Sequence, residues 1–347
     1  MESIFTFDSL LFTVLVKVLV IVAFFFVAAL VVGYLEHKVM GHMQDRTGPM
    51  EAGLGPVKHG VGQLVADGAK FLQKEDIIPR SADPWVFALA PGVALVPTLT
   101  ILVVIPFGPG VWAENLDLGL FFALAASGVT VIGVLMAGWA SANKFSLMGA
   151  IRDAAQLIAY ELPLVLAGAA VALQAGTLSL VGIVERQNEL LLFGAVPVWY
   201  GIPQFVGLGL FFVAAMAELN RPPFDMPIAD SEIIAGHMTE YTGLRFAFFL
   251  LSEYAGMVVL SALATVLFLG GWYPWPGAEL PDGPLGAVIG TVVTLAKIII
   301  LTLLMTWARA TFPRLREDQL QTMAWTILIP LALAQIVVIA IVIVVLP

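Results

Sequence analysis

The stretch from Ala217 to Glu253 gathers ionisable side chains where one apolar run stops and the next begins. The whole sequence is 60% hydrophobic, yet six of its 25 acidic residues fall in this stretch. They are Glu218, Asp225, Asp230, Glu232, Glu240 and Glu253. Clustered carboxylates in a low dielectric have raised, coupled pKa values and can hold protons near neutral pH. Ionisable groups this close to lipid indicate function, although a solvated loop with scattered charge is the alternative.

Local structure decides how these acids are arranged. Pro222-Pro223 cannot continue a helix and removes two backbone donors. A short helix is predicted to restart near Asp230-Ser231, either of which can cap it. On that helix Glu232, Gly236 and Glu240 recur every four residues and share a face. Its two carboxylates would then lie about 12 Å apart along one line.

Other ionisable residues lie inside apolar runs. Asp153, Gln156 and Tyr160 share one helical face at spacings of three and four. Glu161 comes two residues before a proline, which weakens the helix there. Lys297 lies near the centre of another apolar run, and we expect it to face a partner or water rather than lipid.

Composition places the protein in a membrane. The chain has 347 residues, of which only 12% are charged, and a mean hydropathy of +0.97, so it is predicted to be a polytopic membrane protein. It has no cysteine, which excludes disulfides and Cys-ligated zinc or iron–sulfur clusters. The net charge of −9 argues against nucleic acid binding. No G-x-G-x-x-G motif, P-loop or dense histidine cluster occurs, so neither a nucleotide nor a metal site is expected.

Eight apolar segments have the length of a membrane span. They cover residues 10–35, 84–106, 118–140, 154–175, 201–219, 246–270, 285–308 and 325–346. The fourth and fifth are the weakest, because they are short or interrupted by Pro163 and Pro203. No soluble domain fits between any pair, so residues 1–347 are predicted to form one all-α transmembrane domain.

Basic residues predict the orientation. Of the 16 lysines and arginines, 13 fall in the loops after the first, third, fifth and seventh spans, or border them. The positive-inside rule therefore places the loop at 37–83 and the acidic loop at 218–245 on the cytoplasmic side, and both termini opposite.

The first loop, residues 37–83, contains a helical pattern of its own. Glycines and prolines interrupt it up to Gly62, after which apolar residues recur at helical spacing as far as Leu72. This pattern predicts an amphipathic helix at the membrane surface. It acts either as an anchor or as the wall of a portal for an amphiphilic substrate.

These segments together resemble one protein family, the membrane H subunit (subunit 1) of respiratory complex I, the proton-pumping NADH:quinone oxidoreductase. The photosynthetic complex I counterpart is also similar. The resemblance covers nearly the whole chain, and the segments that carry it are Glu36-His37-Lys38-Val39-Met40, Gln44-x-Arg46-x-Gly48-Pro49, Ala66-Asp67-Gly68-x-Lys70, Lys74-Glu75-Asp76, Arg152-x-Ala154-Ala155-Gln156 to Tyr160-Glu161-x-Pro163, Ala217-Glu218-x-Asn220-Arg221-Pro222-Pro223-Phe224-Asp225, Glu232-x-x-Ala235-Gly236-x-x-Thr239-Glu240-Tyr241, Leu267-Phe268-Leu269-Gly270-Gly271-Trp272 and Arg309-Ala310-Thr311-x-Pro313-Arg314-x-Arg316-x-Asp318-Gln319-Leu320.

The resemblance implies that the chain forms the membrane side of a quinone tunnel and starts a carboxylate path for protons. Tunnel residues would be Glu36, Arg46, Asp67, Lys70, Arg152, Tyr160, Arg221 and Asp225. Proton-path residues would be Glu161, Glu218, Asp230, Glu232, Glu240 and Glu253. Quinone, of which ubiquinone is one type, is then the substrate. The chain itself is expected to bind no cofactor or metal.

The resemblance also implies partners and a location. The cytoplasmic loops would dock peripheral-arm subunits that carry FMN and iron–sulfur clusters and contact the quinone headgroup. Antiporter-like membrane subunits and lipid would contact the membrane part. The location would be the inner (plasma) membrane of a bacterium, or an organellar membrane.

Three departures from the family pattern stand out. The family usually has glutamate where this chain has Ile228 and Asp230, so one acid is lost and one is shortened. Met50-Glu51 replaces the usual Asn-Arg after Gly48-Pro49. The stretch that includes Val57-Lys58-His59-Gly60 is also longer than usual. These departures affect the tunnel mouth and the number of groups on the path.

Two other classes fit parts of the pattern. A stand-alone proton-coupled transporter would explain acids at depth and proline-interrupted spans, but the sequence lacks a convincing internal repeat. The equivalent membrane subunit of a membrane-bound hydrogenase shares ancestry with the family and need not use quinone. The dense match in the first loop favours complex I.

Overall fold

The computed structural model describes residues 10–53, 59–192, 196–228 and 230–345. As the sequence predicts, the protein is a helical membrane protein, and seven of the described helical segments are long and apolar enough to cross a membrane. They are α1 (Leu10–Met43), α3 (Pro84–Ile101), α4 (Gly119–Ala140), α5 (Lys144–Ala175), α9 (Gly243–Phe268), α10 (Pro284–Thr311) and the continuous run of α11 (Glu317–Thr322), η3 (Met323–Leu328, a π-helix) and α12 (Ile329–Val345).

The predicted count of eight spans is not confirmed, because the fifth is shorter than expected. Residues 200–204 form a turn that includes Pro203, and helix α7 begins only at Phe205 and ends at Glu218, after 14 residues. The expected interruption at Pro163 is wrong, since α5 continues through this proline for 32 residues. A proline removes one helical hydrogen bond, and packing against neighbouring helices tolerates that loss in membrane helices.

Short elements occupy the loops between these helices. They are α2 (Gln63–Gln73), α6 (Leu180–Glu189), the two-residue strands β1 (Leu191–Leu192) and β2 (Val196–Pro197), η1 (Met226–Ile228), α8 (Asp230–Ile233) and η2 (Gly236–Met238). The two strands pair antiparallel.

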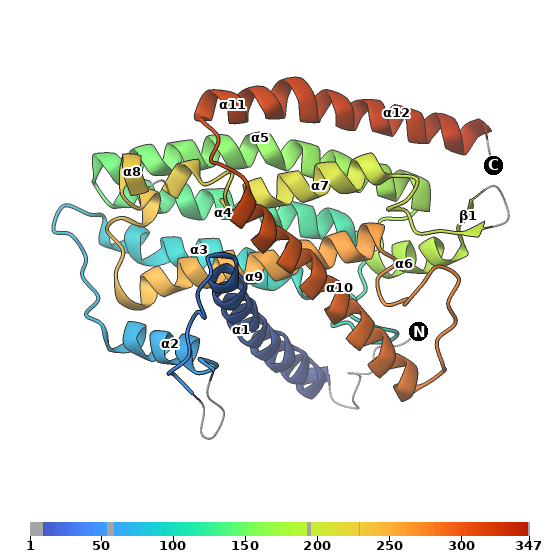
Figure 1. Cartoon of the computed structure of the whole chain (residues 1–347), viewed down its shortest axis with the longest axis horizontal. Coiled ribbons are helices and arrows are strands. Elements are labelled where there is room, and N and C mark those ends of the chain that lie inside the picture. Colours follow the sequence, from blue (N-terminus) through green and yellow to red (C-terminus); the bar gives the residue numbers. More distant parts are fainter. Residues whose placement is uncertain (1–9, 54–58, 193–195, 229, 346–347) are drawn as a thin grey trace.

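The long helices pack as a bundle in which α1 and α10 run obliquely to the others (Figure 1). Helices α3, α4 and α5 approach each other through small residues. A Cβ added at Gly133 would lie 2.6 Å from the backbone nitrogen of Ala94, and one at Gly138 would lie 2.2 Å from the Ala150 Cβ. Such close approach of backbones is typical of helix packing in membranes. Helices associate there through van der Waals contact between small residues, because the hydrophobic effect does not drive association in lipid.

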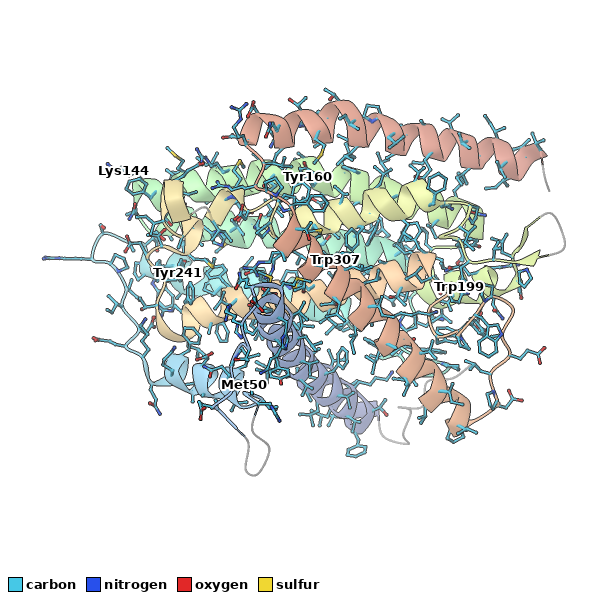
Figure 2. All side chains as sticks on the ribbon, in the orientation of Figure 1. Met50, Lys144, Tyr160, Trp199, Tyr241 and Trp307 are labelled. Carbon is cyan, nitrogen blue, oxygen red and sulfur yellow. The ribbon has the colours of Figure 1, made fainter. Side chains whose placement is uncertain are left out.

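The loops after α1, α4, α7 and α10 meet at one end of the bundle, called here the basic end. Arg245 at the start of α9 lies 3.2 Å from Asp76 of the first loop, and Arg314 after α10 lies 3.2 Å from Asp225 after α7. Asn143, which follows α4, donates to Glu240 at 2.5 Å. Figure 2 shows Lys144 and Tyr241 at this end and Trp199 at the opposite one. The described start of α1 and end of α12 lie away from the basic end (Figure 1).

Helix α2 lies in the first loop, where the sequence predicts a helix. It packs against both α1 and α9: Leu64 fits over Gly33, where an added Cβ would lie 2.9 Å from its Cδ1, and the rings of Phe71 and Phe246 have centroids 5.9 Å apart. None of its residues is buried, and Leu72 is 69% exposed. The helix therefore presents apolar side chains outward as well as inward.

The two ends can be assigned to the two sides of the membrane by cysteine labelling, since the chain has no native cysteine. Lys74 and Glu189 are both exposed, at opposite ends of the bundle. From the distribution of basic residues we expect an impermeant thiol reagent to label Lys74→Cys only in inside-out vesicles and Glu189→Cys only in right-side-out vesicles. Labelling of both from the same side would contradict the predicted orientation.

Candidate functional site: buried carboxylates and arginines

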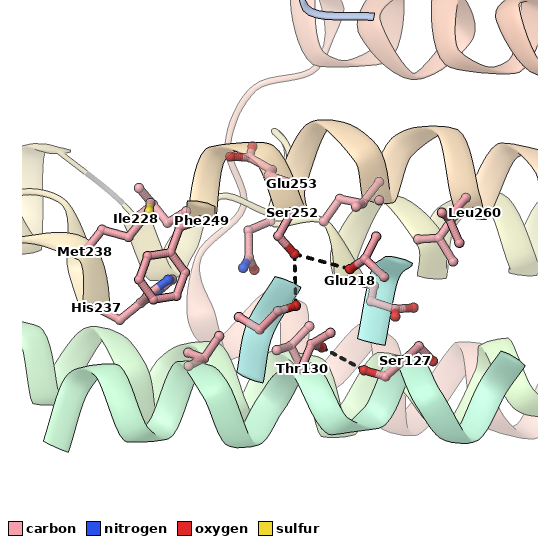
Figure 3. A pocket seen from close by; sticks show the side chains of 18 of the residues that line it. Ser127, Thr130, Glu218, Ile228, His237, Met238, Phe249, Ser252, Glu253 and Leu260 are labelled. Atoms are coloured by element: carbon pink, nitrogen blue, oxygen red, sulfur yellow. Dashed lines mark hydrogen bonds between the residues drawn. The ribbon is translucent and has the colours of Figure 1, made fainter. Parts of the chain in front are cut away.

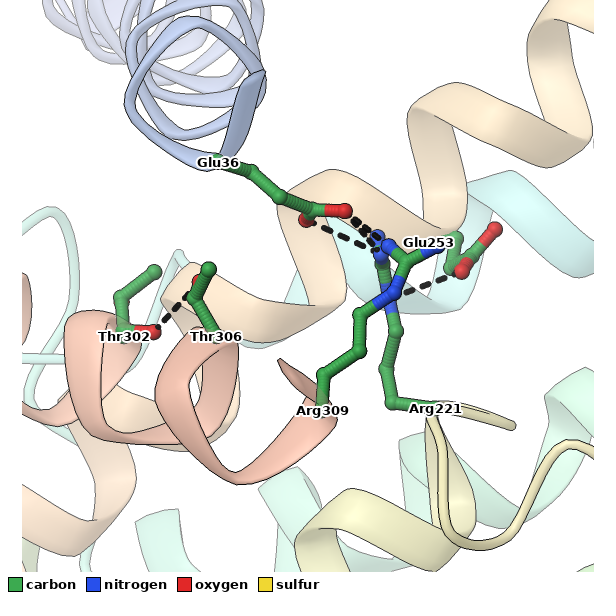
Figure 4. A network of polar contacts seen from close by, with 6 residues as sticks. All are labelled: Glu36, Arg221, Glu253, Thr302, Thr306 and Arg309. Carbon is green, nitrogen blue, oxygen red and sulfur yellow. Dashed lines mark hydrogen bonds and ion pairs between the residues drawn. The ribbon is translucent and has the colours of Figure 1, made fainter. Parts of the chain in front are cut away.

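A buried arginine at the basic end holds two carboxylates. Arg221 is 3% exposed. Its Nη1 donates to both oxygens of Glu36, at 2.8 and 2.9 Å, and its Nε lies 2.8 Å from Oε1 of Glu253 (Figure 4). The three residues come from the loop after α7, from α1 and from α9. We call them, with Arg309, the Arg221 cluster.

Arg309, near the end of α10, adds a second cation through an ion pair with Glu36. The Arg221 guanidinium also lies over the ring of Tyr254, 4.7 Å from its centroid. Burial alone would lower the pKa of Arg221, but attraction to Glu253 and Glu36 outweighs it and the pKa rises. The cluster therefore contains two permanent cations and two carboxylates, and it is balanced in charge when both carboxylates are ionised.

The loop that carries Arg221 is fixed to α5. Asn220 has a left-handed backbone (φ 51°), which asparagine tolerates, and its amide donates to Asp153 at 2.8 Å. Gln156 Nε2 donates to the carbonyls of Ala217 and Phe224, at 2.8 and 2.7 Å. Asp153 and Gln156 are completely buried, so the helical face predicted from their spacing does point into the protein.

The same aspartate holds the other end of the acidic loop. His237 Nδ1 lies 3.1 Å from Asp153 Oδ2, and its ring packs edge-on against Phe249. Gly149 lets the loop come close, since a Cβ there would lie 2.5 Å from Gly236 Cα. Arg221, Phe224, Met226 and His237 are all buried. The alternative of a solvated loop is therefore wrong for this part of the stretch.

A hollow of about 100 Å³ lies inside the bundle, next to Glu253 of the Arg221 cluster (Figure 3). Glu253 and Glu218 both line it. Its other polar lining comes from Asn220 and His237 of the acidic loop and from hydroxyl side chains on α3, α4 and α9, namely Thr98, Ser127, Thr130 and Ser252. A water needs roughly 10–15 Å³ of such volume and two to four polar partners, so the hollow has the size and the lining to hold several.

Glu218, at the end of α7, lines the hollow and has a neighbouring acid, Glu161 on α5. Gly128 on α4 makes room for Glu161, because a Cβ there would lie 2.4 Å from the carboxylate Oε1. Within the described part of the chain, Oε2 of Glu218 is buried and has no hydrogen-bond partner. A carboxylate oxygen in that position is stabilised when it binds a proton or accepts a hydrogen bond from water. Water in the neighbouring hollow can provide either.

Glu232 and Glu240 do not lie on one helical face, so that prediction is wrong. Helix α8 ends at Ile233, because Ile234 and Gly236 adopt left-handed backbone conformations (φ 65° and 55°) that an α-helix excludes. Glu240 instead accepts a hydrogen bond from Asn143 at 2.5 Å.

Glu232 belongs to a surface ion-pair group at the basic end. Its Oε2 lies 2.7 Å from Arg152 Nη1, and its Oε1 lies 3.4 Å from Arg314 Nη2. Arg314 also pairs with Asp225, and Arg152 with Glu317. The hydrogen bond from Arg152 is the main reason that the pKa of Glu232 is lowered, with Arg314 adding to it. The side chain is half exposed and stays ionised, which suits a docking surface better than a proton carrier.

The other predicted site residues are dispersed. Arg46 is exposed and donates to Gln44 at 2.9 Å. Asp67 and Lys70 pair with each other on α2, 3.6 Å apart. The Tyr160 hydroxyl is buried and donates to the Leu320 carbonyl at 3.0 Å. The side chain of Asp230 lies outside the described part of the chain.

Sequence reasoning did not single out Arg309 or the hydroxyl side chains around the hollow. Arg309 begins a motif that runs from the last turn of α10 to Leu320, but nothing local connects it with Glu36, 273 residues away. Serine and threonine in apolar helices often bond to their own backbone, as Thr130 does to the Ser127 carbonyl. One signal in the sequence could have pointed to them, namely Ser252, which directly precedes Glu253.

The fold and this site together define a class: a polytopic helical membrane protein with buried carboxylates that lead from one end of the bundle into its interior. The family model described as NADH dehydrogenase matches residues 16–340. Three relatives named as the H subunit of NADH-quinone oxidoreductase come from Brevibacillus brevis (46% identical; 89% of this chain and 87% of the relative), Geobacillus kaustophilus (44%; 88% and 87%) and Bacillus mycoides (47%; 87% and 85%). The chain belongs to the NADH dehydrogenase family of which these H subunits are members.

Removing Arg221 should destabilise the protein strongly. The variant Arg221→Ala leaves Glu36 and Glu253 buried without their main partner, and a broken buried ion pair costs about 3–5 kcal/mol. We expect a lower thermal midpoint of the purified protein or a loss of assembled subunit, with Arg221→Lys less affected. The matched control is Arg316→Ala, because Arg316 forms an exposed pair with Asp318. Equal midpoints for the two alanine variants would contradict a structural role for the Arg221 cluster.

Proposed function

We propose that this chain is the H subunit of a proton-pumping NADH-quinone oxidoreductase, where it forms the membrane side of the quinone tunnel and the first part of the proton path. The observation that supports the path most directly is the continuity from the Arg221 cluster through the hollow to Glu218 and Glu161. Such a complex is an enzyme, and this chain contributes to it without a redox centre of its own. The names of the relatives favour this function over a transporter or a hydrogenase subunit.

In the proposed tunnel, quinone enters from the lipid beside α2. This helix packs in the angle between α1 and α9 and has apolar side chains on its outer surface. An amphipathic helix lying at the membrane surface would admit a long apolar tail while keeping its polar side in water. Glu36, Arg46, Asp67 and Lys70 all belong to α1 or the first loop, near this entrance.

Reduction of a quinone consumes two electrons and two protons. In the proposed path, quinone reduction changes which groups in the quinone tunnel carry protons. This change alters the charge balance of the Arg221 cluster. Glu253 takes part in that cluster and also lines the hollow. Water in the hollow would then connect Glu253 with Glu218, and Glu218 with its neighbour Glu161. Each transfer needs only rotation of a carboxyl or a water molecule.

The remaining parts of the reaction belong to partner subunits in this proposal. Peripheral-arm subunits would hold FMN and the iron–sulfur clusters, oxidise NADH and dock on the basic end, where Arg152, Glu232 and Arg314 form the surface ion-pair group. Antiporter-like membrane subunits would receive the change in protonation from Glu161. The complex would lie in the inner (plasma) membrane of a bacterium, with α7 and its flanking turn as the eighth crossing and the basic end in the cytoplasm.

Glu218→Gln tests the path. The amide keeps the size of the side chain but cannot exchange a proton, so we expect quinone reduction and proton pumping to fall together, by about tenfold or more. Both are measured in vesicles that contain the variant complex, after its subunit content has been checked. The control is Glu189→Gln, an exposed acid at the other end. Unchanged turnover and pumping in an intact Glu218→Gln complex would contradict the path.

Arg46→Ala tests the tunnel separately. Arg46 is exposed just past α1 and donates a hydrogen bond to its neighbour Gln44 through Nε, so the rest of its guanidinium can meet a carbonyl or carboxylate. We expect slower quinone reduction while electron transfer from NADH to an artificial acceptor at the peripheral arm persists. Equal loss of both activities would indicate failed assembly instead of a tunnel defect.

A further inference from the structure

A second hollow lies between α1 and α10, toward the end of the bundle away from the Arg221 cluster. It measures about 220 Å³, and the segment that follows α3 forms its third wall. Figure 1 shows α1 and α10 spreading apart toward this end. The described lining is apolar except for Lys17 and Thr291, and includes Val20, Ile21, Leu102 and Leu295. This composition suits a hydrocarbon chain and not a water-soluble ligand.

Pairs of packed aromatic rings stabilise the elements that line this hollow. Phe24 of α1 meets Phe107 of the following segment edge-on, with ring centroids 4.8 Å apart. Trp112 is buried and packs on Trp272, at 6.5 Å. Offset and edge-on ring pairs favour a defined geometry. The hollow is therefore a built feature of the fold, bordered by two helices whose outer residues are exposed.

Among the described residues that line the hollow, the one charged group, Lys17, has an oppositely charged neighbour. Lys17 Nζ lies 3.4 Å from Glu114 Oε2, and their side chains are 17% and 58% exposed. This separation is longer than the roughly 2.7–2.9 Å of a strong ammonium–carboxylate bond. The rim of the hollow thus presents one positive and one negative group side by side, each with capacity for a further partner.

Lys17 and Glu114 lie toward the end of the bundle away from the Arg221 cluster. Lys17 precedes Glu36 by 19 residues on the same helix, which is about 29 Å along the helix axis at 1.5 Å per residue. Because α1 runs obliquely to the other long helices (Figure 1), the depth between the two residues is smaller than this length. The flexible four-carbon stem of a lysine lets its ammonium extend toward the headgroup level while the stem stays among apolar groups.

We propose that this hollow binds one phospholipid with a zwitterionic, primary-amine headgroup, of the phosphatidylethanolamine class. Part of an acyl chain fills the hollow. The phosphate contacts the Lys17 ammonium, and the lipid ammonium contacts the Glu114 carboxylate. An anionic lipid would match Lys17 but place uncompensated negative charge beside Glu114. A choline headgroup carries no N–H to donate to this carboxylate.

The test uses the intact complex in lipid discs that contain a phosphatidylethanolamine analogue with a photoreactive acyl chain. Peptides that carry the label are mapped by mass spectrometry, and a phosphatidylglycerol analogue with the same chain is the comparison. We expect the phosphatidylethanolamine probe to label residues 17–24 and 102–113. In Lys17→Gln this labelling should fall roughly three- to fivefold, the effect of one exposed charge contact.

A charge reversal tests the headgroup. Glu114→Lys makes both rim groups positive, so labelling by phosphatidylethanolamine should fall and labelling by phosphatidylglycerol should rise. The matched control is Glu189→Lys, in the exposed Arg186–Glu189 pair, which should change neither. Ala113→Trp tests the hollow, since the larger side chain should exclude the acyl chain and abolish labelling while Lys17 and Glu114 remain.

Three results would overturn the proposal. The first is equal labelling by the two lipids in both the native and the Glu114→Lys complex. The second is unchanged labelling of residues 17–24 and 102–113 in an assembled Ala113→Trp complex. The third is preferential labelling of these residues by a photoreactive quinone, which would identify the occupant as a quinone tail. None of these readouts depends on quinone reduction or proton pumping.

Discussion

The charge of Arg221 is the constraint on which the rest of the site depends. A guanidinium that is 3% exposed must be surrounded by acceptors, because an unpaired buried charge is prohibitively costly. Its partners Glu36 and Glu253 come from α1 and α9, and Arg309 from α10 completes the charge balance. Arg221 thereby joins two long helices, α1 and α9, and Glu36 joins α1 to α10 through Arg309. The loop must turn inward for this to happen, which explains why Arg221, Phe224 and Met226 are buried.

The inward turn of this loop also creates the hollow. Asn220 and Gln156 hold its first part on α5, and the pairing of His237 with Asp153 holds its last part. Between these two attachments a space remains next to Glu253, and both apolar side chains, Ile228 among them, and polar side chains border it. Polar lining and volume together favour water over an empty cavity. A structural ion-pair cluster and a proposed proton path thus share one carboxylate.

The parts of this structure that depend on local pattern were predictable from the sequence. Apolar runs predicted seven of the spans, and helical spacing placed Asp153 and Gln156 on a buried face. Lys297 was expected to face a partner, and its ammonium does donate to three backbone carbonyls at 2.6–2.9 Å. The backbone reversal at Ile234 was not predictable, since a β-branched residue rarely adopts a left-handed conformation and does so only where tertiary contacts impose it.

Partners distant in sequence were the other limit. Glu36 and Arg221 are 185 residues apart, so periodicity within either segment carries no information about their meeting. The sequence therefore predicted which residues would be costly to bury, and left open which of them would neutralise each other. Glu232 illustrates the consequence: its acidity suggested a relay, whereas two arginines make it part of a surface ion-pair group.

Ile228 shows how the site compensates for a lost acid. Members of the family that it resembles usually have glutamate here, and in this chain the isoleucine side chain lines the hollow. A hydrocarbon at that position cannot carry a proton, so a path along the wall of the hollow is interrupted. Glu253 and Glu218 line the same hollow, however, and need no residue between them if water fills its volume. Loss of one carboxylate is then tolerable, because water in the hollow, and not an unbroken row of acidic side chains, connects Glu253 with Glu218. The same reasoning makes Glu218 and Glu253 hard to replace in the proposed path, since they are the two carboxylates that line the hollow among the described residues.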